Sequence, residues 1–119
     1  MNPEELKQRT KRMSLDVLRI ATHVPRSREG DVIARQIIRS ATSVAANYRA
    51  ACKARSRADF INKIGIVEEE ADETALWLEF ISELSLADKL IVEKELKEVN
   101  ELVAIFAVSA ITAKSARSN

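Results

Sequence analysis

The chain has 119 residues, which is enough for one domain with a core of ordinary size and too few for two. Hydrophobic residues make up 46% and charged residues 31%, which excludes a disordered chain, while two Gly, two Pro and 4% aromatics exclude a turn-rich all-β fold. The net charge is only +1, but residues 26–57 hold eight Arg or Lys against two acids, and residues 59–83 hold eight acids against one Lys. This asymmetry needs a structural or functional explanation.

Apolar residues at helical spacing predict a first helix over about residues 4–23. Pro3 suits a first helical turn, and Pro25 ends the segment because the residue before proline disfavours the helical conformation. The face expected to enter the core consists of Leu6, Thr10, Met13, Val17 and Ile20, followed by Val24.

A second helix is predicted over about residues 29–53, with a core face of Ile33, Ile37, Ser40, Val44, Tyr48 and Ala51. At 100° per residue, a basic stripe lies opposite this face: Arg28, Arg35, Arg39, Arg49 and Lys53. A row of small polar residues lies beside it: Gln36, Ser40, Ser43 and Asn47. The stripe is either ordinary solvated surface or a binding face, and the small residues favour close packing against a neighbouring helix.

The third helix is predicted over about residues 57–84, after a capping box in which Ser56 and Asp59 satisfy backbone N–H groups at the helix start. Its core face is Phe60, Ile64, Val67, Ala71, Thr74, Leu78 and Ile81. A second apolar set points elsewhere: Ile66, Trp77, Phe80 and Leu84. Because monomers rarely expose a contiguous aromatic patch, this set predicts self-association, with Glu69 and Glu73 on the same surface.

The fourth helix is predicted over about residues 91–114, with a core face of Val92, Leu96, Val99, Val103, Phe106 and Ala110. It is apolar on all sides from Val103 to Ile111, although one side of a helix in a monomeric bundle should be polar and face water. Four amphipathic helices with short connections predict an all-α, antiparallel up-down four-helix bundle spanning residues 1–119 as a single domain.

No catalytic, metal or cofactor site is predicted. The single His23 belongs to no Glu-x-x-His motif, and no Gly-rich loop could cradle a phosphate. The lone Cys52 fits a reducing compartment. The charged N-terminus has no signal-peptide pattern, and the longest late uncharged run, residues 102–113, is shorter than the ~20 residues of a membrane-spanning helix. We therefore expect a cytoplasmic protein that is neither an enzyme nor membrane-bound.

Four sequence blocks resemble the bacterial four-helix-bundle family named after proteins encoded in intervening sequences of 23S ribosomal RNA. Residues 36–47 match its Q-x-x-R-[SA]-A-x-S-[IV]-x-x-N motif, and residues 56–63 resemble its next block. Residues 70–78 match its E-x-x-E-[TS]-x-x-W-L block, and residues 98–112 resemble its last helix. Many members continue N-I-A-E-G, whereas this chain reads Asn47-Tyr48-Arg49-Ala50-Ala51, which makes the surface more basic and removes a helix stop.

The resemblance implies a left-handed bundle that assembles as a homopentamer around a central channel, and related accessory proteins of retroelements bind nucleic acid and a reverse transcriptase. Two functions follow as hypotheses. In the first, a non-enzymatic oligomer binds RNA or DNA through Arg39, Arg49, Lys53, Arg55 and Arg57. In the second, the ring is a structural adaptor for a protein partner, and these cations pair with Glu69, Asp72 and Glu73 across a subunit boundary.

Overall fold

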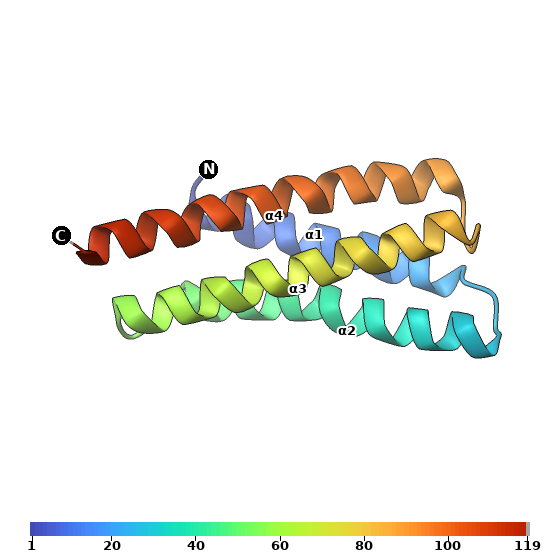
Figure 1. Ribbon diagram of the computed structural model, residues 1–119, viewed down its shortest axis with the longest axis horizontal. Coiled ribbons are helices and arrows are strands. Elements are labelled where there is room, and N and C mark those ends of the chain that lie inside the picture. The colour runs from blue at the N-terminus through green and yellow to red at the C-terminus, as the bar shows by residue number, and fades with distance from the viewer. Residues whose placement is uncertain (119) are drawn as a thin grey trace.

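The structure, a computed structural model that describes residues 1–118, consists of four α-helices and no strand in that range. The helices are α1 (Pro3–Thr22), α2 (Arg28–Ala51), α3 (Arg57–Glu83) and α4 (Lys89–Ser118). Figure 1 shows them side by side along a molecule of 50 × 22 × 21 Å, with successive links at alternating ends. All four predicted helices are therefore present, and the all-α class is confirmed.

Side-chain caps explain where the helices begin. The side chains of Asn2, Ser27 and Ser56 each accept a hydrogen bond from the backbone N–H three residues later, at 2.8, 2.9 and 3.0 Å. Each bond satisfies one of the N–H groups that a helix start leaves without a partner. Asp88 does the same for Ile91 at 3.1 Å.

Three local predictions need correction. The second helix ends at Ala51, because Cys52 and Lys53 form a turn and not a further helical turn. The fourth helix begins at Lys89, because Asp88 provides its cap. The capping box of α3 is only half formed, since the Asp59 carboxylate accepts from the backbone N–H of Arg55 and not from that of Ser56.

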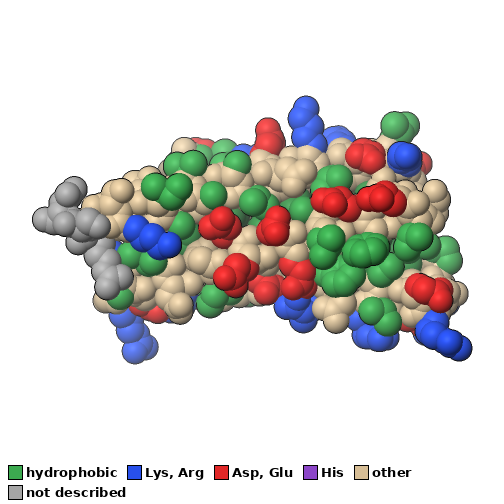
Figure 2. Space-filling model, viewed as in Figure 1, with side chains coloured by type: hydrophobic (Ala, Val, Ile, Leu, Met, Phe, Trp, Pro, Cys, Tyr) green, Lys and Arg blue, Asp and Glu red, His purple; other side chains and the backbone are tan. Residues whose placement is uncertain are grey.

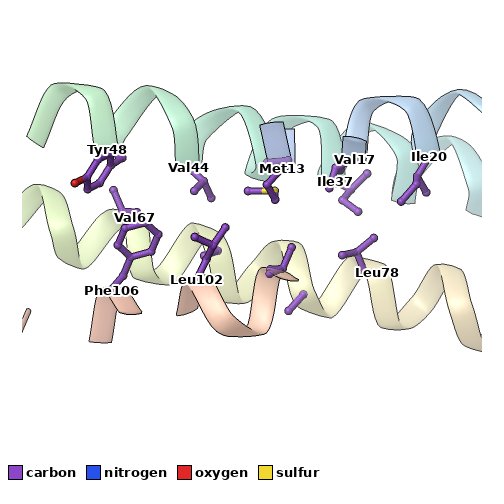
Figure 3. Packing of buried hydrophobic residues seen from close by; sticks show 14 of the residues in the cluster. Met13, Val17, Ile20, Ile37, Val44, Tyr48, Val67, Leu78, Leu102 and Phe106 are labelled. Carbon is purple, nitrogen blue, oxygen red and sulfur yellow. The ribbon is translucent and has the colours of Figure 1, made fainter. Parts of the chain in front are cut away.

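The core runs the length of the bundle, and Figure 3 shows side chains from all four helices meeting there. The predicted core faces of the first two helices are buried throughout, as is that of α3 apart from half-buried Phe60. Near one end of the core, the rings of Tyr48 and Phe106 lie 5.4 Å apart between centroids, within the range of favourable aromatic pairs.

The predicted core face of α4 is shifted at two positions. Leu102 and Glu95 are buried, whereas Leu96 and Val103 are only half-buried. A buried glutamate was not expected from the sequence. It lies at the seam between α1 and α4, which is the least closely packed of the four helix–helix seams.

By length and composition alone, α4 could cross a membrane over Lys89–Ala116, alone among the helices of residues 1–118. Helices that line the core of soluble bundles meet the same criterion. Here 22% of the apolar stretch of α4 is buried, and its buried residues, from Val92 to Ala110, belong to the core that the four helices share.

Candidate nucleic-acid interface

A groove between α1 and α2 brings together four basic side chains. It measures about 560 Å³ and is bordered by Lys7 and Lys11 of α1, by Arg49 of α2 and by Lys53 of the α2–α3 link, with Glu4 as the one acid in its lining. Lys7 lies 3.6 Å from Glu4, whereas Lys11, Arg49 and Lys53 form no ion pair within the described residues. Three of the four cations of the groove therefore have no acidic partner among residues 1–118.

Small side chains make the groove hollow. Thr42, Ala45 and Ala46 line it on the α2 side, in the two turns before Arg49. Larger residues at these positions would fill the space between the helices and hold a bound phosphate chain away from the lysines. The Ala- and Thr-rich stretch within the basic segment thus has a geometric consequence, which is to open a depression bordered by cations.

A second depression of about 470 Å³ adjoins the first and shares Lys53 with it. It is lined by Ala50, Lys53, Arg55, Asp59 and Lys63. Both carboxylate oxygens of Asp59 accept from Lys63 Nζ at 2.7 Å, and these bonds, with that from the Arg55 backbone, hold the pKa of Asp59 below its usual value. With three cations and one acid, this depression extends the basic surface around the α2–α3 link.

Arg39 occupies a different place from the one the sequence predicted. Its guanidinium pairs with Glu70, at 3.0 Å, and with Glu73, both on α3. The Arg39–Glu73 pair thus forms within one chain, whereas pairing of these cations across a subunit boundary stays a prediction. Arg39 is already neutralised and lies apart from the groove.

Arg57 is also engaged within the chain. Its Nη1 donates to the backbone carbonyl oxygen of Ala116, at 3.0 Å, near the C-terminal end of α4. A cation near the end of a helix interacts favourably with the helix dipole. Of the five predicted phosphate contacts, Arg49, Lys53 and Arg55 therefore gather around the two depressions, whereas Arg39 and Arg57 have other partners.

The small polar row of α2 forms hydrogen bonds inside the bundle. Buried Ser40 accepts from Thr74 Oγ1 of α3 at 2.8 Å, which joins the two helices where both side chains are small. Asn47 donates to the carbonyl and the hydroxyl of Ser43 at 2.9 and 2.8 Å. These contacts place Ser40 at a helix–helix seam and keep Ser43 and Asn47 as a pair on α2.

The predicted apolar surface of α3 is partly exposed. Phe80 is 42% exposed and Leu84 is 53% exposed, while Ile66 and Trp77 are half-buried. The Trp77 and Phe80 rings lie 5.5 Å apart, and Trp77 Nε1 donates to Glu73 at 3.2 Å. Glu69 is exposed. Figure 2 shows hydrophobic side chains gathered over the C-terminal half of α3, so an apolar face is available there.

Comparison with known proteins agrees with this architecture. A sequence model described as 23S rRNA-intervening sequence protein matches residues 4–107, which include parts of all four helices. The chain belongs to the 23S rRNA-intervening sequence protein family. A crystal structure of a protein with unknown function from the S23 ribosomal protein family of Bacteroides thetaiotaomicron is similar: it has 30% sequence identity and a TM-score of 0.80, and the match covers 87% of this chain and 96% of that one. No curated protein matches the chain.

One departure from the 23S rRNA-intervening sequence family motif lies in the candidate interface. Ala50 stands where the N-I-A-E-G motif of many members places Glu, and it lines the second depression beside Lys53 and Arg55. An acid there would offset one of these cations. Among residues 1–118, no group of three or more His, Cys, Asp or Glu comes together as a metal site.

Sequence reasoning missed Lys7 and Lys11, which form the α1 border of the groove. The available signal was their i, i+4 spacing, which places both on one side of the first helix. What the spacing does not indicate is which neighbouring helix that side borders.

Proposed function

We propose that this protein is a non-enzymatic cytoplasmic oligomer that binds nucleic acid, with RNA as the first candidate, through the α1–α2 groove and the α2–α3 link. The phosphate contacts are Lys7, Lys11, Arg49, Lys53 and Arg55. The observation that carries the proposal is the groove itself, in which three cations without an ion pair surround a depression lined by small residues. Phosphate neutralisation by such cations releases counterions and provides affinity that does not depend on sequence.

Self-association would multiply this modest charge. We propose that left-handed, antiparallel up-down bundles assemble into a homopentamer, with Ile66, Glu69, Glu73, Trp77, Phe80 and Leu84 at the interface. The exposure of Phe80 and Leu84 supports an interface on α3. Repetition of one basic groove around a ring gives a stronger potential than a single copy provides, which reconciles nucleic-acid binding with a net charge of +1.

The binding test compares two double variants that each remove two positive charges. Arg49→Gln with Lys53→Gln removes groove cations, whereas Arg28→Gln with Arg35→Gln removes exposed cations near the start of the helix. Fluorescence anisotropy of a labelled 20-nucleotide RNA is measured across a range of salt concentrations. Each lost phosphate contact on a single strand reduces the slope of log affinity against log salt by about 0.7, so the groove variant loses about 1.4 in slope.

The matched control keeps the slope of the parent protein, because its charges lie away from the groove. Equal losses in both variants would mean that only total charge matters. Unchanged affinity in the groove variant, with helicity retained by circular dichroism, would refute the assigned interface.

A second candidate function is a structural or adaptor ring that binds a protein partner and no nucleic acid. The exposed apolar side chains favour it, since Leu90, beyond the proposed interface, is 82% exposed at the start of α4. This function predicts unchanged behaviour of the groove variant and no RNA affinity at ~100 mM salt.

A further inference from the structure

A pocket unrelated to the basic groove lies in the seam between α1 and α4. It measures about 470 Å³, within the size range of small-molecule sites, and most of its surface is apolar. Ile20 of α1, Ala87 of the α3–α4 link and Ile91 of α4 provide that apolar surface. The pocket arises because α1 and α4 pack less closely than the other neighbouring pairs of helices.

Glu95 lines this pocket, and one of its two carboxyl oxygens lacks a hydrogen-bond donor. The residue is 8% exposed, and its Oε2 is buried without a hydrogen-bond partner among residues 1–118. A buried acceptor of this kind is rare in folded proteins, because it has lost its water and gained nothing in exchange. Burial raises the pKa of Glu95 to about 7, together with the negative charges of Asp16 and Glu98 and a hydrogen bond between the Glu95 and Asp16 carboxyl groups. Glu95 is therefore a site that a donor on a ligand would satisfy.

The other charged groups of the pocket limit what the ligand can be. From α1 and its C-cap, Asp16 pairs with Arg19 at 2.9 Å, and His23 Nδ1 is within hydrogen-bond distance of the Arg19 carbonyl, at 2.9 Å. From α4 and its cap come Lys94 and Asp88, and Glu98 also acts on Glu95 through its charge. Because Arg19 is paired with Asp16, it does not neutralise the Glu95 carboxyl group, which is the acceptor left for a ligand. The positive charge of Lys94, which also lines the pocket, disfavours a second cation on the ligand.

We propose that this pocket binds a small amphipathic monoamine, whose ammonium group pairs with the Glu95 carboxylate while its hydrocarbon part lies against Ile20, Ala87 and Ile91. An ammonium satisfies the orphaned acceptor with a charge-assisted hydrogen bond, which is stronger than a neutral one. The apolar wall accounts for a hydrocarbon body, because its burial is favourable without any directional contact. A neutral alcohol of equal length would keep the burial of the hydrocarbon part and lose most of the contribution of the charge-assisted hydrogen bond.

Isothermal titration of the full chain with hexylamine, and with 1-hexanol as the uncharged analogue, tests this proposal. Hexylamine is expected to bind at least roughly tenfold more tightly than hexanol, and Glu95→Gln to weaken hexylamine binding by a similar factor. Glu79→Gln, an equivalent change on the exposed face of α3, leaves binding unchanged. Equal binding of amine and alcohol, or no effect of Glu95→Gln, would overturn the proposal.

The pH dependence of the parent protein gives a test that needs no variant. An alkylammonium remains charged between pH 6 and 8, as lysine does, whereas Glu95 with a pKa of about 7 changes charge in this range. Hexylamine affinity is therefore expected to fall by close to tenfold from pH 8 to pH 6, and one proton to be released per amine bound at pH 6. Affinity that does not vary with pH would contradict a contact with Glu95, even if the Gln variant failed to fold.

Discussion

Replacing Glu95 by Gln isolates the energetic consequence of burying a carboxyl group in the α1–α4 seam. Gln has the same shape and no charge. In the parent protein the pKa of Glu95 rises from 4.5 to about 7 on folding, mainly because burial disfavours the carboxylate and then because Asp16 adds a second negative charge. The folded state therefore holds its proton at pH values where the unfolded chain has released it.

The sign and size of the effect follow from proton linkage. Between pH 4.5 and 7 the folded protein binds more protons than the unfolded chain at this group, so the group's contribution to the free energy of unfolding falls as pH rises. At ~1.4 kcal/mol per pKa unit, Glu95→Gln gains about 2 to 3 kcal/mol over the parent between pH 5 and pH 8. Above pH 8 the difference levels off, since both states are then ionised.

Urea unfolding of both proteins at pH 5, 6, 7 and 8 measures this difference. Carboxylates whose pKa is lowered in the folded state, such as Asp31 and Asp59, contribute equally to both proteins and cancel in the comparison. If the free energy of unfolding falls with urea concentration at the same slope in both proteins, the two unfolding reactions expose the same surface and can be compared. A stability difference that stays constant across this pH range would refute the burial of an ionisable Glu95.

Three further changes test the packing of the fold by thermal or urea unfolding. Ser85→Gly should stabilise the protein by about 0.5 to 1 kcal/mol, because Ser85 has a positive φ of 54° at the end of α3, a conformation that glycine adopts without steric cost; a loss of stability would contradict this. Gly30→Ala should destabilise it by about 1 to 3 kcal/mol, because the added Cβ would lie 2.5 Å from the carbonyl oxygen of Pro25 in the α1–α2 link; a neutral effect would mean that the link yields easily. Phe106→Ala should cost about 3 to 5 kcal/mol, because the ring is fully buried against Tyr48, and a cost below ~1 kcal/mol would show that this end of the core is loosely packed.

The sequence predicted the helices well because their signals are local. Ser27 and Ser56 cap the helices that they precede, and Pro25 follows the first helix. The core face of α2 could be predicted because apolar residues recur on one side of the helix, and charged residues on the opposite side, with helical period. Where one side of a helix is apolar and the other is charged, the pattern alone decides which side is buried.

The fourth helix shows where this reasoning stops. It is apolar on several sides, so a face through Leu96 and Val103 and a face through Glu95 and Leu102 fit the helical period almost equally well. Packing against three other helices decides between them, and it buries Glu95. No local signal in the sequence predicts a buried acid, because composition alone would place a glutamate in solvent.

The candidate interface depends on tertiary contacts in the same way. Arg49 and Lys53 could be predicted as a basic face of one helix, but their partners Lys7 and Lys11 come from another. Arg39 belongs to the same predicted stripe, yet its long side chain reaches Glu70 and Glu73 on α3. A helical projection places Cα atoms and cannot show which neighbour a long side chain will meet.

The most direct test of the proposed function is light-scattering mass of freshly purified protein, with absorbance at 260 and 280 nm recorded on the same peak. A nucleic-acid-binding ring predicts a mass near five subunits of 13.3 kDa, together with excess absorbance at 260 nm. A multimer free of nucleic acid would favour the protein adaptor. A monomer with no bound nucleic acid would contradict both the assembly and the role proposed for the α1–α2 groove.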